Sequence, residues 1–126
     1  IIDGLNIIKP PFNVNEVAKK AAIESLKDVK FIQRSIKHNV VYATKLKFFL
    51  EKYNIASNKV SANFLLLNFE KCKFKAKYFY EKLKSKGIIL RSTEEGYKIK
   101  NMLRLTIGSK NDCLKFMLAV ERIFKT

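Results

Sequence analysis

A stripe of apolar residues between positions 29 and 53 places the strongest constraint on how this chain can fold. Its members recur at three- and four-residue steps, the spacing of one face of an α-helix. They are Ile32, Ile36, Ala43, Leu46, Leu50 and Tyr53. A helix of about 26 residues is roughly 39 Å long, whereas a domain of about 100 residues has a radius of gyration near 13 Å. The helix therefore overhangs its own domain, and we expect it to pack against another one.

Residues that can cap helices divide the first part of the chain into two predicted helices. Asn13 stands three residues before Glu16, as in a capping box, and predicts a first helix from residue 14 to about residue 27. Asp28 can cap the long helix, which should then cover residues 29–54.

Short apolar runs after the long helix predict a small sheet. Residues 64–67 form a run without polar alternation, as in a strand that is buried on both faces. Two further strands are expected at residues 88–90 and 102–107, with a turn at residues 94–96 between them. We therefore expect an α/β fold in which a small, mainly antiparallel sheet packs under helices.

Two more helices are predicted beside this sheet. One covers residues 73–86 and ends at Gly87, which can adopt the left-handed conformation of a helix stop. The last helix begins after Ser109, which is spaced from Asp112 as in a capping box. Its buried side is expected to carry Leu114, Met117, Leu118 and Ile123.

The balance of charge is strongly basic. Lys and Arg number 26 against 11 Asp and Glu, a net charge of +15, which can indicate a nucleic-acid partner. Only four of these basic residues are arginines, however, and the lysines occur in every segment, which is typical of a solvated surface. A stand-alone nucleic-acid-binding domain remains an alternative that we do not favour. No membrane partner is expected, because no apolar run approaches the ~20 residues of a membrane span.

Few residues could support metal or thiol chemistry. Cys72 and Cys113 are isolated in the sequence and are interpreted as free thiols of a cytoplasmic protein. His38 is the single histidine, and we interpret it as a surface or interface residue rather than a catalytic one. The sequence therefore predicts no metal site.

Arg104 interrupts the apolar run of residues 103–107, in a chain that nearly always uses lysine for positive charge. Strand alternation places it on the face opposite Leu103 and Leu105. A half-buried guanidinium needs an anion, because an unpaired buried charge costs several kcal/mol. That anion can be an internal carboxylate or a small acid from outside the chain, and the guanidinium fork matches either. Arg91 ends its predicted strand in a similar setting, so the two arginines suggest a shared anion site.

Four segments occur in an order and at separations that resemble a known family. They are Pro-Pro-Phe-Asn-Val-Asn (residues 10–15), Ser-Ala-Asn-Phe (61–64), Gly-Ile-Ile-Leu-Arg (87–91) and Leu-Arg-Leu-Thr-Ile-Gly (103–108). Together they resemble the C-terminal part of histidinol-phosphate aminotransferase, a pyridoxal-phosphate enzyme of the aspartate aminotransferase superfamily. The resemblance covers essentially the whole chain and implies the fold of that family's small domain.

The resemblance also implies roles for particular residues. Arg104 matches the arginine that holds the substrate α-carboxylate, Arg91 matches a neighbour lining the same site, and Asn63 matches the start of the core strand near the active-site cleft. Residues 1–28 would be the return segment and first helix from a large domain. Residues 29–126 would be the small domain, with the long helix at the seam.

The same resemblance implies that the cofactor lysine and the phosphate-binding residues lie upstream of this chain. None of the 22 lysines sits in a Ser-x-x-Lys cofactor loop. We therefore expect an inactive C-terminal fragment that contributes no catalytic residue and does not hold pyridoxal phosphate covalently. Its implied partners are the missing large domain, a second subunit of a homodimer and an amino-acid substrate. Open alternatives are a related aminotransferase or pyridoxal-phosphate decarboxylase, and a non-catalytic domain that docks through the long helix.

Overall fold

The structure is a computed structural model that describes residues 1–9 and 12–125. Pro10 and Pro11, which open the Pro-Pro-Phe-Asn-Val-Asn segment, lie outside the described residues. The chain divides into two units, Ile1–Arg34 and Ser35–Thr126, and the division falls inside the long helix. The predicted domain boundary between residues 28 and 29 stays a prediction.

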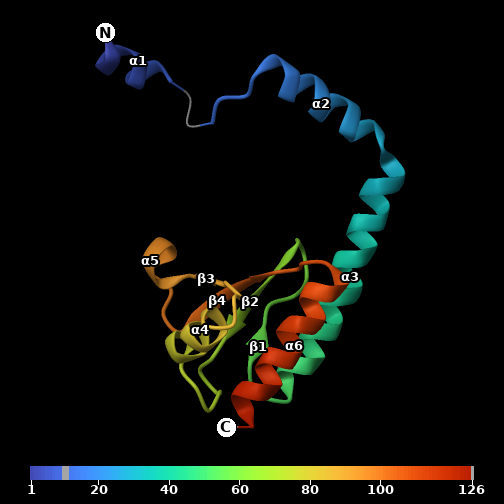
Figure 1. Cartoon of the computed structure of the whole chain (residues 1–126), viewed down its shortest axis with the longest axis vertical. Coiled ribbons are helices and arrows are strands. Elements are labelled where there is room, and N and C mark those ends of the chain that lie inside the picture. The colour runs from blue at the N-terminus through green and yellow to red at the C-terminus, as the bar shows by residue number, and fades with distance from the viewer. Residues whose placement is uncertain (10–11, 126) are drawn as a thin grey trace. The chain divides into compact units, whose positions relative to one another are not determined.

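The first unit contains helices α1 (Ile2–Ile8) and α2 (Glu16–Lys27) (Figure 1). Asn15 caps α2, since its Oδ1 accepts a hydrogen bond of 2.8 Å from the backbone N–H of Ala18. The prediction that Asn13 is the cap was therefore wrong by two residues. Two asparagines precede the helix, and the one adjacent to its first residue is the one whose side chain reaches a free amide of the first turn.

The long helix is α3 (Val29–Glu51). Asp28 caps it as predicted, because its Oδ1 accepts a 2.9 Å hydrogen bond from the N–H of Phe31. The helix ends three residues earlier than expected, where Asn54 takes a left-handed φ of 57° and donates to the Glu51 carbonyl. Its buried residues are Ala43, Leu46 and Leu50, all members of the predicted stripe. No helix of the described residues has the length and hydropathy needed to cross a membrane.

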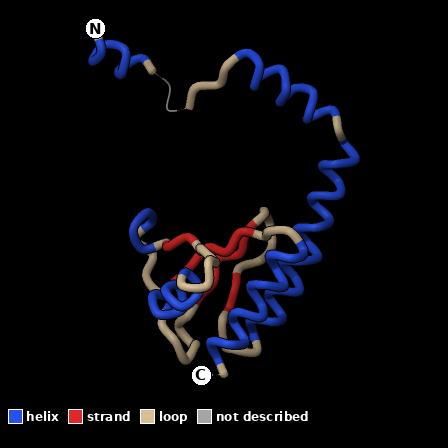
Figure 2. The backbone as a smooth tube through the Cα atoms, viewed as in Figure 1, coloured by secondary structure: helices blue, strands red, loops and turns tan. Residues whose placement is uncertain are grey.

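The second unit contains a four-stranded antiparallel sheet (Figure 2). Its strands are β1 (Ala56–Ser57), β2 (Phe64–Asn68), β3 (Arg91–Ser92) and β4 (Met102–Thr106), in the spatial order β1-β2-β4-β3. All three pairings are antiparallel. The predicted class, a small antiparallel sheet with helices, is confirmed.

Residues 88–90 were expected to form a strand, and this prediction was wrong, because strand pairing begins only at Arg91. The N–H of Ile88 instead donates 3.0 Å to the carbonyl of Leu83, at the end of α4 (Ala76–Lys84). Gly87 makes this turn possible with the left-handed φ of 73° that the sequence predicted. The run of residues 88–90 thus begins with a hydrogen bond to the end of α4, and pairing with the sheet starts only at the next residue, Arg91.

The predicted turn at residues 94–96 is instead a short helix, α5 (Glu94–Tyr97). Thr93, which precedes it, is buried, and its Oγ1 lies 2.8 Å from the Ile99 carbonyl and 2.9 Å from the Met102 carbonyl. The hydroxyl therefore ties the residues after α5 to the beginning of β4. No apolar pattern marks this contact in the sequence.

The last helix is α6 (Lys110–Phe124), and the capping box of Ser109 and Asp112 is present as predicted. The predicted buried side was wrong at two of its four residues, because Leu114 and Leu118 are 42% and 55% exposed, whereas Ile123 is buried and Met117 is partly buried against the core. The other buried residues of this helix are Cys113, Phe116, Ala119 and Val120. The helix carries apolar residues on more than one side, so periodicity alone permits two rotations about the helix axis.

Leucines at alternate positions of β2 and β4 face the helices. Leu65, Leu67, Leu103 and Leu105 are buried and share one apolar cluster with residues of α3, α4 and α6. The prediction that both faces of β2 are buried was wrong, because Phe64 and Leu66 on the other face are only partly buried. The helices therefore cover one face of the sheet, and the face that carries Arg104 is not part of the buried core.

Helices α3 and α6 lie beside each other in the second unit (Figure 1). Where α3 ends, the ring of Tyr53 stacks on that of Phe124 at a centroid distance of 4.3 Å. The Phe124 ring also lies 5.1 Å from the ring of Phe74 and 6.3 Å from that of Phe79, which belongs to α4. These aromatic contacts join the ends of the three helices over the sheet.

Gly108, between β4 and α6, allows a close approach that a larger residue would prevent. A Cβ at this position would lie 2.8 Å from the Cβ of Asp112, so Gly108→Ala must displace the capping carboxylate. We expect it to lower the free energy of unfolding by about 1–3 kcal/mol, measured by urea denaturation. Gly96→Ala is the matched control, because its added Cβ meets no atom within 4 Å. Equal midpoints for the two variants would contradict the packing at Gly108.

The capping box should also make stability depend on pH. The side-chain and backbone hydrogen bonds from Ser109 hold the pKa of Asp112 below its ordinary value. Its contribution to stability is therefore complete above the ordinary pKa of an aspartate and is lost as the pH falls through the lowered pKa. Unfolding midpoints measured from about pH 7 to about pH 2 should converge for the wild type and Asp112→Asn at the acid end. Curves that stay parallel would show that the carboxylate charge does not matter.

Candidate functional site

Arg104 lies in the middle of β4 on the face that points away from the buried core, as strand alternation predicted. Its Cα partners in the sheet are Leu66 on β2 and Arg91 on β3. Residues directly opposite each other in antiparallel strands share one face of the sheet. The structure therefore brings the two predicted arginines together as a cross-strand pair.

Nothing within the described residues neutralises this pair. Like charges directly opposite each other destabilise a sheet. No carboxylate of the described residues forms an ion pair with Arg104 or Arg91. The Nε of Arg104 is moreover buried without a hydrogen-bond partner in the part of the chain that the structure describes. The internal salt bridge, which is one of the two interpretations of Arg104, is thus not formed among residues 1–9 and 12–125.

An aromatic ring accompanies each guanidinium. The Cζ of Arg104 lies 5.3 Å from the centroid of the Phe64 ring, and the Cζ of Arg91 lies 5.8 Å from that of Tyr97. A cation–π contact uses none of the N–H donors of a guanidinium for a hydrogen bond, so these donors can still bind an anion. Tyr97 is not predictable as a site residue from the sequence, because only the short helix α5 returns it toward Arg91.

Asn63 is not a cross-strand partner of either arginine. It is an exposed residue just before β2, and its backbone carbonyl accepts a 2.8 Å hydrogen bond from the N–H of Ile107. It stands three residues along the chain from Leu66, the partner of Arg104, which is about 10 Å in an extended strand. A contact between its side chain and a substrate stays a prediction.

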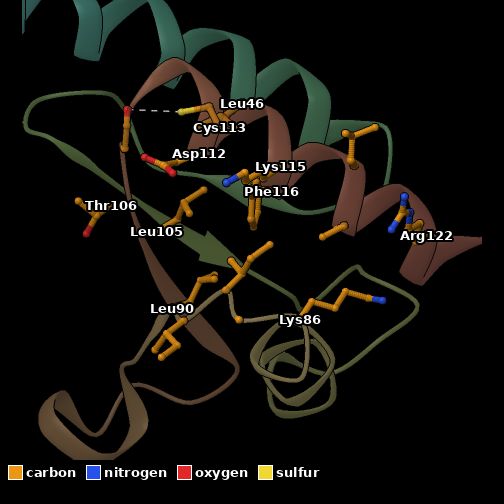
Figure 3. A pocket seen from close by; sticks show the side chains of 16 residues that line it. Leu46, Lys86, Leu90, Leu105, Thr106, Asp112, Cys113, Lys115, Phe116 and Arg122 are labelled. Carbon is orange, nitrogen blue, oxygen red and sulfur yellow. Dashed lines mark hydrogen bonds between the residues drawn. The ribbon is translucent and has the colours of Figure 1, made fainter.

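A groove of about 640 Å³ lies elsewhere in the second unit, between α6 and residues 86–90 (Figure 3). Its lining includes the apolar side chains of Leu46, Leu105 and Phe116. Lys86 and Lys115 add positive charge to it. Neither Arg104 nor Arg91 lines this groove. The candidate anion site is therefore the open face of the sheet and not an enclosed cavity of this chain.

The lysines of the chain do not fit a covalent cofactor site. A lysine that reacts as an amine must lose its proton, which proteins achieve by desolvation or a neighbouring cation. No lysine in the described residues is buried, and Lys47 alone among them is partly buried. Lys110, which follows the arginine strand, is exposed at the first position of α6. The described residues thus do not fit the covalent attachment of pyridoxal phosphate.

Over nearly its whole length, the chain is similar to the C-terminal region of histidinol-phosphate aminotransferases. The protein of that name from Pelagibacter ubique (strain HTCC1062) is 60% identical over 124 residues, which are 98% of this chain and 34% of the relative. Histidinol-phosphate aminotransferase 2 of Legionella pneumophila (strain Lens) is 34% identical over 98% of this chain and 32% of its own length. The chain therefore spans about a third of the length of these curated relatives. No family model matches it.

Solved structures share the fold. The histidinol-phosphate aminotransferase from Clostridium acetobutylicum has a TM-score of 0.77 at 23% identity, over 96% of this chain and 36% of that one. A decarboxylase from Sulfurospirillum multivorans has a TM-score of 0.70 at 19% identity, over 97% of this chain and 36% of that one. The predicted resemblance to the aminotransferase small-domain fold is confirmed.

Replacement of Arg104 by an apolar residue tests whether its charge serves the fold. Arg104→Met keeps a long side chain and removes an unpaired, half-buried charge opposite Arg91. We expect an unchanged or increased free energy of unfolding in urea. Leu103→Ala, one residue earlier on the core face of β4, is the control and should lose about 2–5 kcal/mol. A comparable loss for Arg104→Met would make Arg104 a structural residue.

Proposed function

We propose that this chain is the small domain of a pyridoxal-phosphate-dependent histidinol-phosphate aminotransferase, in which Arg104 binds the anionic group of the substrates. The observation that carries the proposal is the arrangement of Arg104 and Arg91 as a cross-strand pair without an internal counterion. The relative that is 60% identical supports the choice of activity. Arg91 is proposed as the second arginine of the site, and Asn63 as a residue at its edge.

The proposed reaction transfers an amino group between histidinol phosphate and 2-oxoglutarate. Its two substrates present different anions, because histidinol phosphate carries a phosphate ester and 2-oxoglutarate carries carboxylates. A guanidinium can bind either anion through two parallel N–H···O hydrogen bonds. Two facing arginines also offer two positive charges, which suits the larger charge of a phosphate. One site can therefore serve both substrates in turn.

The part of this chain in the proposed reaction is binding and orientation. Pyridoxal phosphate, when bound by the remainder of the enzyme, supplies an electron sink for the reacting carbon. Arg104 fixes one end of the substrate and so directs its amine-bearing carbon toward that cofactor, which is a gain in orientation. Phe64 and Leu66, on the same face of the sheet, give the bound anion an apolar surrounding. Where the proposed large domain covers this open face and excludes water from it, the electrostatic attraction between the guanidinium and the anion is stronger.

The proposed partners are a large domain, which supplies the cofactor site, and a second subunit of a cytoplasmic homodimer. Support for the large domain comes from the relatives, of which this chain spans about a third. Unit Ile1–Arg34 also exposes many large apolar side chains, such as Val17 at 79% and Leu26 at 71%. Apolar surface of this extent is typical of an interface. Free thiols at Cys72 and Cys113 agree with a reducing compartment.

Two alternatives remain distinguishable. A related aminotransferase or decarboxylase would share the fold, as the Sulfurospirillum multivorans decarboxylase does, and would differ in the substrate that reacts. A basic nucleic-acid-binding domain would bind DNA or RNA with an affinity that falls steeply between two salt concentrations. A gel shift at both concentrations separates this second alternative from the enzyme.

The test of the proposal is a chimera in which this chain replaces the matching third of the Pelagibacter ubique enzyme. We expect the chimera to react with histidinol phosphate. Arg104→Ala should lower kcat/KM by an amount that corresponds to about 2–4 kcal/mol of activation free energy, because a charge-assisted contact is lost. Arg104→Lys should restore little of the lost kcat/KM, since an ammonium cannot form the bidentate pair with the anion. Arg34→Ala, at an exposed arginine of α3, is the control. Near-wild-type kinetics for Arg104→Ala would remove Arg104 from the site.

A further inference from the structure

His38 links the long helix to the end of the arginine strand. Its Nε2 lies 2.9 Å from the carbonyl oxygen of Gly108, a residue 70 positions further along the chain. A carbonyl can only accept a hydrogen bond, so Nε2 must carry the proton in this contact. The imidazole also lies against the ring of Tyr42, one turn along α3, at a centroid distance of 4.5 Å. The half-buried ring is therefore held by both a polar and an aromatic contact.

The residues that follow β4 are anchored to three different parts of the second unit. Ile107 donates a 2.8 Å backbone hydrogen bond to Asn63, just before β2. Gly108 accepts from His38 of α3, and Ser109 begins the capping box of α6. Of these anchors, the imidazole is the one that reaches across from α3. Arg104 stands only four residues before Gly108 on the same extended chain.

We propose that His38 is a positioning residue for Arg104. By donating to the Gly108 carbonyl, it fixes the end of β4 relative to α3 and thereby sets the place at which the guanidinium meets the substrate anion. This inference rests on the proposed role of Arg104 in binding that anion. Removal of the donor should weaken anion binding, because small displacements of a positioning group reduce its effect steeply.

Two substitutions of His38 separate the effect of its hydrogen bond to Gly108 from the effect of its ring contact with Tyr42. His38→Phe keeps an aromatic ring against Tyr42 and removes the donor, whereas His38→Gln keeps an N–H donor at a similar reach and removes the ring. Lys37→Gln, at the exposed neighbouring residue, is the control for a change on α3. If the hydrogen bond acts, the Gln variant resembles the wild type and the Phe variant does not. The reverse order would show that His38 acts through packing and would overturn the proposal.

The first measurement uses the 126-residue chain and does not depend on any activity. Amide hydrogen exchange at residues 105–109 should accelerate about tenfold in His38→Phe, as expected for the loss of one hydrogen bond, and stay near wild type in His38→Gln. Unchanged exchange in the Phe variant would show that the contact does not hold the end of β4, and would overturn the proposal.

The second measurement uses the chimera and separates this inference from the proposed function. His38→Phe should raise the KM for 2-oxoglutarate about tenfold with a smaller change in kcat, and His38→Gln should restore it. If Arg104→Ala impairs the enzyme but His38→Phe does not, the inference fails and the proposed function stands. If Arg104→Ala is itself without effect, the proposed function fails, and the positioning role fails with it.

Discussion

The antiparallel pairing of β2 with β4 is the interaction on which the rest of the second unit depends. Five residue pairs, from Phe64 opposite Thr106 to Asn68 opposite Met102, fix the register of the two central strands. This register sends Leu65, Leu67, Leu103 and Leu105 toward the helices. It also places Arg104 on the other face, and a shift by one residue would exchange the two faces. Core formation and exposure of the arginine are therefore consequences of the same pairing.

The pairing of Arg104 with Arg91 lowers the stability of the fold. Arg104 and Arg91 face each other without a carboxylate from the described residues, and one buried nitrogen lacks a partner. Two aromatic rings reduce this destabilisation by cation–π contacts but do not neutralise the charge. Arrangements that break the rules of stability occur mainly at functional sites. The anion-binding proposal gives this one a physical reason.

Each unit leaves surface uncovered that a longer protein could use. The second unit covers one face of its sheet with helices, and the first exposes apolar residues along α1 and α2. The curated relatives are about three times as long as the segment that they share with this chain. The open face and the apolar helices are thus the surfaces at which the proposed large domain would meet this one.

Local patterns were enough to predict the features that depend on neighbouring residues. The long helix, its cap at Asp28, the capping box of Ser109 and the outward direction of Arg104 all follow from spacings of two to four residues. The tertiary structure alone decided which side of α6 is buried, where the edge strand begins and that Arg91 stands opposite Arg104. It also revealed the contact between His38 and Gly108. These features depend on segments far apart in the chain, and short-range periodicity contains no information about which distant residues will meet.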